Sequence, residues 1–264
     1  MADDVFDMRG KVVVVTGGQG MLGRGFCSAL VARGARVASF DVTQNAATAA
    51  SDSLMVVRAD VTDRRSLENA LAQVRSKWGV PDGLVNCAAL DSPPDAPATQ
   101  NGPVETYPGD VWDKVMEVNV KGVFQACQVI GGAMHEAKRG AIVNIASIYG
   151  IVSPDQRLYE HRRARGEAFF KPAAYSASKS ALLNLTRHLA TYWAPEGPRV
   201  NTLSLGGVFS NQDAQFLERY EYRTPLGRMA RAGEYEGALV FLLSAASSYM
   251  TGANLVVDGG WTAW

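Results

Sequence analysis

The stretch "KVVVVTGGQGMLG" (residues 11–23) decides how this chain folds. Its four consecutive valines are typical of a strand that is buried on both faces of a parallel sheet. The glycines that follow predict a tight turn, and the pattern of "MLGRGFCSALVARG" (21–34) predicts a helix with one apolar side that ends at Gly34. This part of the sequence therefore predicts a strand, a glycine-rich turn and a helix in direct succession.

The same alternation continues to the C-terminus. Short apolar runs predict further strands at 35–41, 54–60, 82–89, 140–147, 199–205 and 254–260. Helical patterns lie at 61–79, with a cap at Thr62 or Asp63, and at about 110–134, 172–194 and 233–246. Strands that alternate with helices of about ten or more residues form a parallel sheet covered on both faces. We therefore expect a single α/β domain over residues 1–264, a doubly wound Rossmann domain with a mainly parallel seven-stranded sheet.

The composition limits the classes of partner. The chain has 264 residues, of which 47% are hydrophobic and 20% charged, and its formal net charge is zero. Binding to phosphate backbones or anionic membrane surfaces requires an excess of Lys and Arg, so we expect neither a nucleic acid nor a membrane as partner. The N-terminal "MADDVFDMRG" is acidic and lacks a long apolar run, which argues against a signal peptide or anchor and favours a cytoplasmic protein.

Three cysteines, Cys27, Cys87 and Cys127, form an odd set without metal-site spacing. Each lies in an apolar context, so we expect small buried side chains in a reducing compartment rather than a catalytic thiol. The sequence predicts no metal site.

The turn "TGGQGMLG" (16–23) has the position and composition of a phosphate site for a dinucleotide. Glycine lets the backbone approach a pyrophosphate closely, and the N-terminus of the following helix offers N–H groups and the positive end of its dipole. The expected cofactor contacts in this turn are Gly17, Gln19, Gly20, Met21, Leu22 and Gly23.

Asp41 ends the second predicted strand, 18 residues after Gly23. A carboxylate there accepts hydrogen bonds from the adenosine ribose hydroxyls and repels a 2′-phosphate, and the next residue is Val42 rather than Arg. The sequence thus predicts NAD, with NADP less favoured. Asp60, at the end of the third predicted strand, either meets the adenine or caps a helix, and the sequence alone leaves both interpretations open.

Further motifs occur in the order seen in one protein family. They are "DV" (60–61), "NCAA" (86–89), "VNV" around Asn119, Ser147 after the fifth strand, "YSASK" (175–179), "NTLSLGG" (201–207) and "VDGG" (257–260). With the glycine turn they span essentially the whole chain, which resembles the classical short-chain dehydrogenases/reductases. The resemblance implies NAD(P)-dependent interconversion of a secondary alcohol and a ketone, with residues about 10–90 binding the nucleotide and about 91–264 the substrate. It adds to the expected cofactor contacts Val61, Asn86, Ala88, Tyr175, Lys179, Gly206 and Val208.

Four residues, Asn119, Ser147, Tyr175 and Lys179, match the catalytic tetrad of that family. Residues four apart lie on one face of a helix, so Tyr175 and Lys179 are expected to point together. A free phenol, with a pKa near ~10, is too weakly acidic to act as a base at neutral pH, but a neighbouring ammonium and a positive nicotinamide lower its pKa. The resemblance implies that Tyr175 exchanges the substrate proton and Ser147 holds the substrate oxygen. It also implies that Lys179 holds the nicotinamide ribose and that Asn119 interrupts its helix and holds a water.

The sequence departs from the family pattern at Met21, Ala89 and Leu205, where the family usually has Gly, Gly and Pro. The resulting spacing of the glycine turn resembles the extended branch, which includes epimerases and dehydratases. None of these changes removes a reactive group. An epimerase or dehydratase with tightly held NAD, and an NAD-binding protein without turnover, remain alternatives.

The segment 148–171, between Ser147 and Tyr175, is irregular and longer than in most of the family. Its basic residues are His161, Arg162, Arg163, Arg165 and Lys171. They fit either a lid for an anionic substrate or a solvated or intersubunit loop. Stretches such as "SIYGIVSPDQRLYE" (147–160) resemble a subgroup linked to bacterial surface-glycan and flagellin (legionaminic-type) sugar biosynthesis, which implies a sugar-derived substrate. A general polyol, sugar-acid or 3-oxoacyl reductase is the alternative.

Family members usually form tetramers, so the resemblance implies a homo-oligomer, a tetramer or a dimer. The expected contacts are the helices at about 110–134 and 172–194 and the last strand, and "WTAW" (261–264) fits either an interface or the edge of a core. Residues 91–110 are expected to be a loop, and the stretch from the sixth strand to about residue 230 is expected to be mobile.

Overall fold

Parallel strands form the central layer of the computed structural model, which describes residues 4–43, 51–91 and 97–264. In these residues the strands are β1 (Val12–Thr16), β2 (Arg36–Asp41), β3 (Leu54–Arg58), β4 (Gly83–Asn86), β5 (Ala141–Ser147), β6 (Arg199–Leu205) and β7 (Asn254–Val257). They form one seven-stranded sheet in the order β3-β2-β1-β4-β5-β6-β7, and all neighbouring pairs are parallel. The predicted doubly wound Rossmann fold is confirmed.

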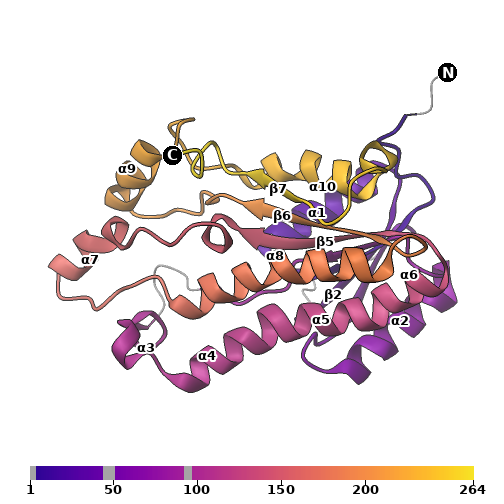
Figure 1. Cartoon of the computed structure of the whole chain (residues 1–264), viewed down its shortest axis with the longest axis horizontal. Coiled ribbons are helices and arrows are strands. Elements are labelled where there is room, and N and C mark those ends of the chain that lie inside the picture. The colour runs from indigo at the N-terminus through magenta and orange to yellow at the C-terminus, as the bar shows by residue number, and fades with distance from the viewer. Residues whose placement is uncertain (1–3, 44–50, 92–96) are drawn as a thin grey trace.

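Helices cover both faces of this sheet (Figure 1). One face carries α1 (Met21–Ala32) and α10 (Glu236–Leu243), which contact each other. The other face carries α2 (Arg64–Trp78), α8 (Ala173–Trp193) and a helical run made of α4 (Gly109–Met116), α5 (Gly122–Ala126) and α6 (Gly132–Glu136), joined by wider π turns at Glu117–Lys121 and Cys127–Gly131. Within the described ranges, no helix combines the length and apolar character that a membrane crossing requires.

The valine run of β1 is apolar throughout because alternate residues fill opposite cores. Val12 and Val14 are buried in the core under α2 and α8, whereas Val13 and Val15 are buried in the core under α1 and α10. Successive strand side chains point to opposite faces, so a strand covered on both sides needs apolar residues at every position.

The segments that lacked periodicity contain short helices. They are α3 (Ala98–Asn101), α7 (Glu160–Ala164), α9 (Ala214–Arg223) and 3-10 turns at Val104–Thr106, Ile148–Gly150 and Gln156–Tyr159. The predicted helix at 233–246 consists of α10 with a 3-10 turn on either side, at Ala232–Tyr235 and Ala245–Ser247. α9 forms because Asp213 Oδ1 accepts a hydrogen bond from Phe216 N (2.9 Å) and because Phe216 and Tyr220 are buried. The stretch after β6, which was expected to be mobile, thus contains a helix, and the expectation of a loop over 91–110 is wrong for α3. Part of that predicted loop, residues 92–96, lies outside the described residues.

The start of α1 lies so close to the turn after β1 that Gly23 has no room for a side chain. A Cβ at this position would overlap the Gly17 carbonyl oxygen and lie 2.8 Å from Gly18 Cα. We expect Gly23→Ala to lower the free energy of unfolding, measured by urea titration, by about 1–3 kcal/mol. Gly237→Ala is the control, because that exposed position in α10 has open space for a Cβ and alanine favours a helix. Equal losses in the two variants would contradict this account.

Candidate active site

A cavity of about 630 Å³ lies at the carboxyl ends of the central strands. Ligands of open parallel sheets bind at this edge, where the strand order reverses between β1 and β4. The predicted site residues that line the cavity are Gly17, Gly20, Met21, Leu22, Gly23, Asp41, Asp60, Val61, Ala88, Ser147, Tyr175, Lys179, Gly206 and Val208. The structure thus brings the two expected halves of the site into one continuous space.

Three predicted residues, Gln19, Asn86 and Asn119, are buried and are not among the described lining residues. The Gln19 side-chain amide donates to Ser39 Oγ (2.7 Å), and Asn86 Nδ2 donates to Asn144 Oδ1 (2.8 Å). These side chains support the wall from behind, and direct contact of Gln19 and Asn86 with a cofactor stays a prediction.

The glycine turn forms a close cradle at one end of the cavity. Gly17 has a φ of +65°, and a Cβ there would lie 2.6 Å from Ala88 Cα, so the turn after β1 touches the loop after β4 directly. Gly20 is the N-cap of α1 and the first residues of the helix line the cavity, which presents the amide end of the helix to a ligand. This arrangement fits the pyrophosphate of a dinucleotide.

Asp41 is held in place at the end of β2 by backbone donors. Its Oδ2 accepts a hydrogen bond from Gln19 N (3.0 Å), and its Oδ1 accepts one from Thr43 N (2.9 Å). A fixed carboxylate at the cavity edge suits two ribose hydroxyls and opposes a phosphate.

Asp60 lines the cavity and does not cap the following helix, so its contact with the adenine stays a prediction. Its Oδ1 accepts hydrogen bonds from Thr62 N (2.8 Å) and Thr62 Oγ1 (2.7 Å). The cap of α2 itself is Asp63, whose side chain accepts from Arg65 N. Asp60 therefore braces the turn before α2 while lining the nucleotide end of the cavity.

Ser147, Tyr175 and Lys179 come together from two elements. Ser147 ends β5, and the other two lie one turn apart near the start of α8. Lys179 Nζ donates to the Ile145 carbonyl oxygen (2.9 Å) and lies 5.8 Å from the centre of the Tyr175 ring. A hydroxyl, a phenol and an ammonium at one cavity wall form a set that can hold an oxygen and move its proton.

Asn119 lies in the first π turn of the helical run, so the predicted interruption of its helix is confirmed. Its side chain is fully buried and pairs with the Leu90 main chain, donating to the carbonyl oxygen (3.0 Å) and accepting from the N–H (2.7 Å). It also donates to Ser178 Oγ (3.0 Å), which donates to the Tyr175 carbonyl oxygen (2.7 Å). The side chain thus fixes the loop after β4 to α8. That Asn119 also holds a water remains a prediction.

Burial controls the charge of the reactive pair. It raises the pKa of Tyr175 far above that of a free tyrosine, and the Asp91 carboxylate raises this pKa further, whereas a hydrogen bond with Ser147 lowers it. Burial also lowers the pKa of Lys179. In the protein alone, burial outweighs the expected effect of the ammonium on the phenol, so Tyr175 is a neutral proton donor at neutral pH.

The far end of the cavity has an aromatic wall that the sequence did not reveal. Its rings are those of Tyr149, Tyr159, Phe169, Phe216 and Tyr220. They come from the 148–171 segment and from α9, which are far apart in the chain, so no local spacing signals the cluster. Trp261 supports it from behind, stacked on Tyr220 with ring centres 4.3 Å apart.

The basic residues of the 148–171 segment mostly stabilise the segment itself. Arg162 Nε pairs with Glu167 Oε2 (2.6 Å), and the guanidinium lies 4.0 Å from the Phe169 ring centre. Arg163 donates to the carbonyl oxygens of Phe169 (3.0 Å) and Gln156 (2.8 Å). These two arginines are internal braces and are not among the described lining residues, so they do not form the anion lid that the charge run suggested.

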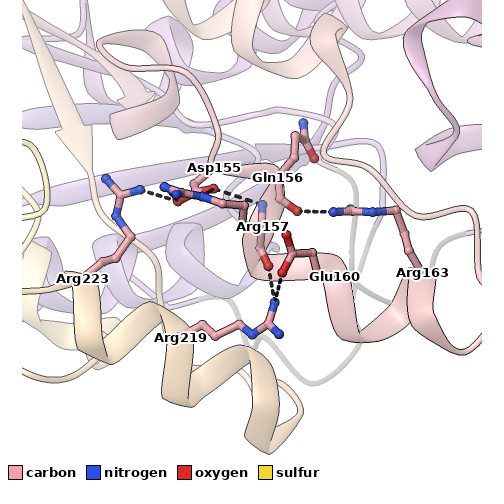
Figure 2. A network of polar contacts seen from close by, with 7 residues as sticks. All are labelled: Asp155, Gln156, Arg157, Glu160, Arg163, Arg219 and Arg223. Atoms are coloured by element: carbon pink, nitrogen blue, oxygen red, sulfur yellow. Dashed lines mark hydrogen bonds and ion pairs between the residues drawn. The ribbon is translucent and has the colours of Figure 1, made fainter.

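Ion pairs join this segment to α9. Figure 2 shows Arg219 reaching the Arg157 carbonyl oxygen and the Glu160 carboxylate, while Arg223 reaches Asp155. The Arg219 Nη1 to Glu160 Oε2 distance is 3.2 Å. The segment and α9 are therefore joined by ion pairs as well as by their rings, and together they form one wall unit.

Comparisons with known proteins agree with this geometry. The family model described as enoyl-(acyl carrier protein) reductase matches residues 18–262. The chain is 35% identical to galactitol 2-dehydrogenase (L-tagatose-forming) of Cereibacter sphaeroides, over 98% of both chains. It is 34% identical to D-threitol dehydrogenase of Mycolicibacterium smegmatis, over 97% of this chain and 95% of the relative. The solved structure of a short chain dehydrogenase from Leptospira borgpetersenii with bound NAD+ has a TM-score of 0.87 and 32% identity, and covers 99% of this chain and 96% of its own.

The position of Asp41 predicts how the protein distinguishes the two nicotinamide cofactors. Asp41→Ala removes two acceptors for ribose hydroxyls, so we expect NADH affinity to fall about tenfold or more, while NADPH affinity does not fall. Fluorescence titration with both cofactors measures this. Asp110→Ala, which removes an exposed carboxylate in the first turn of α4, is the control. Equal losses for NADH and NADPH would show that Asp41 does not set the preference.

Proposed function

The chain belongs to the family of short-chain dehydrogenases/reductases and is an NAD(P)-dependent oxidoreductase, and we propose that it interconverts a sugar alcohol or related polyhydroxylated compound and its ketone with NAD. The observation that carries the proposal is the aromatic and polar end of the cavity beside Ser147 and Tyr175. Rings pack against the C–H groups of such compounds, and a few polar groups bind their hydroxyls. The galactitol and D-threitol dehydrogenases among the relatives support the same substrate class.

The roles of the residues follow from their positions. In the oxidation direction Ser147 holds the substrate oxygen and Tyr175 Oη accepts its proton; in reduction Tyr175 returns the proton. When bound, NAD supplies the hydride acceptor. Lys179, fixed by its bond to Ile145, holds positive charge near the phenol. Asp41 and the start of α1 hold the ribose and the pyrophosphate.

The resemblance of 147–160 to proteins of surface-glycan sugar biosynthesis supports a second candidate, a larger sugar-derived substrate such as a nucleotide sugar. The aromatic wall includes Tyr149 and Tyr159 from this stretch, so the resemblance falls on cavity residues. Assays of nucleotide sugars beside simple polyols separate the two candidates.

We propose that the protein is a cytoplasmic homo-oligomer. Large apolar side chains are exposed on the elements expected to form the contacts: Phe124 on α5, Tyr192 on α8 and Val256 on β7. Their burial between copies would remove apolar surface from water. Analytical sedimentation of the full chain measures the oligomeric state.

The proposed function is tested by NADH formation across a panel of polyols, sugar acids, nucleotide sugars and simple secondary alcohols, each with NAD and with NADP. Turnover highest on polyols with NAD is the expected result. Turnover confined to nucleotide sugars would favour the second candidate. Tightly held NAD without net NADH formation would indicate an epimerase or dehydratase.

Tyr175→Phe removes the group that exchanges the proton but retains the ring. We expect kcat to fall by about 10²–10⁴-fold, the usual contribution of a positioned acid or base. NADH affinity, measured by fluorescence, should stay unchanged, because the aromatic ring still fills its place. Tyr222→Phe, at an exposed position on α9, is the control. Retained turnover in Tyr175→Phe would exclude the phenol as the acid–base group.

Asp91 predicts the direction of a pH shift. Alcohol oxidation needs the Tyr175 phenolate, so kcat/KM for oxidation rises as pH passes the apparent pKa of this group. Since the Asp91 charge raises that pKa, Asp91→Asn should move the rising limb to lower pH. The pH profile of Asp110→Asn should match the wild type. A shift toward higher pH in Asp91→Asn would contradict the assignment.

A further inference from the structure

A buried lysine at the substrate end of the cavity has no role in the proposed proton transfer. Lys171 is 8% exposed, its Nζ lies 2.5 Å from Asp91 Oδ1, and the same atom lies 4.5 Å from the Tyr175 ring centre. Both Lys171 and Asp91 line the cavity. Burying an ammonium is unfavourable unless it is paired, so its position beside the reactive phenol requires an explanation.

The 148–171 segment builds a support for this lysine. The Gln156 side chain donates to the Lys171 carbonyl oxygen (3.0 Å) and accepts from the Lys171 N–H (2.9 Å). The carbonyl oxygen of Gln156 in turn accepts a hydrogen bond from Arg163 Nη2 (2.8 Å), as Figure 2 shows. The main chain of Lys171 is therefore fixed, and its ammonium is held at the cavity wall together with Asp91.

The pair is electrically neutral, which determines the substrates that suit it. Among the described lining residues, the other charged side chains are Asp41 and Asp60 at the nucleotide end and Lys179 beside the phenol. An anionic substrate near Lys171 would also meet the Asp91 carboxylate. A hydroxyl group both accepts and donates, so neighbouring hydroxyls can accept from the ammonium and donate to the carboxylate.

We propose that Lys171 and Asp91 together bind the non-reacting hydroxyls of a neutral polyol and so determine substrate specificity. The pair selects polyols over sugar acids, which carry an opposing charge, and over simple alcohols, which lack the second hydroxyl. This inference rests on the proposed function and names the substrate class of the same site. It also explains why a single buried cation of the basic segment lies at the cavity while the two arginines brace the fold.

The test compares kcat/KM with NAD for galactitol, gluconate and cyclohexanol in the full chain. Lys171→Met should raise KM for galactitol about tenfold or more, as expected for one lost hydrogen bond to a charged group, and leave KM for cyclohexanol unchanged. Asp91→Asn leaves an unbalanced ammonium, so the ratio of kcat/KM for gluconate over galactitol should rise about tenfold. Arg165→Met, which removes an exposed arginine that lies 3.6 Å from Glu167, should match the wild type.

The outcomes of this test distinguish a failure of the specificity role from a failure of the proposed function. If the wild type prefers polyols but Lys171→Met lowers kcat equally on galactitol and cyclohexanol with no change in KM, the specificity role is overturned and the proposed function stands. If the wild type turns over no polyol and no sugar acid, the proposed function fails and the inference fails with it. If it prefers gluconate to galactitol, the proposed function stands and the inference is overturned. Thermal unfolding and NADH titration verify each variant, and if Lys171→Met does not fold, the ratio in Asp91→Asn decides.

Discussion

The hydrogen bond from Lys179 Nζ to the Ile145 carbonyl oxygen is the contact on which the active site depends. A buried ammonium must find an acceptor, and this one finds it on β5, in register with Leu203 of β6. The bond fixes α8 over the sheet. Tyr175 lies one helical turn before Lys179, and Ser147 lies two residues after Ile145 on the same strand face. The repeat of the α-helix and the alternation of side chains along a strand thus place the phenol and the hydroxyl at one cavity wall.

Burial also determines the protonation state of the phenol. It keeps Tyr175 protonated in the protein alone, and the Asp91 charge acts in the same direction. A positive nicotinamide beside the phenol would oppose both effects, so the ability of Tyr175 to act as a base is linked to occupancy by the oxidised cofactor.

The wall unit of the 148–171 segment and α9 is held together by its own ion pairs and ring contacts. The segment also contacts α8 directly, since Ser180 Oγ donates to the Gly150 carbonyl oxygen (3.0 Å), so the wall packs against the part of α8 that carries Lys179.

Much of this architecture is readable from the sequence, because strand and helix periodicities, the Asp63 cap and the Asp41 position are local features. The aromatic wall cannot be predicted from the sequence, because its rings come from two segments that only the fold brings together. The charge run of 148–171 was also ambiguous: an arginine that braces a segment and one that faces solvent look alike in sequence. Lys171 and Asp91 are 80 residues apart, so only the fold brings them together. The sequence likewise does not show that the Asn119 side chain holds the Leu90 main chain, because the two residues are 29 positions apart.

We expect burial to hold Tyr175 as a neutral phenol until the oxidised cofactor binds. Ultraviolet difference titration of tyrosine ionisation, taken as wild type minus Tyr175→Phe because the chain has nine tyrosines, measures the pKa of Tyr175 directly. In the protein alone, Tyr175 should ionise at a higher pH than exposed tyrosines, and its pKa should fall clearly with saturating NAD+. A pKa equal to that of a free tyrosine in the protein alone, or one that does not change with NAD+, would contradict this expectation.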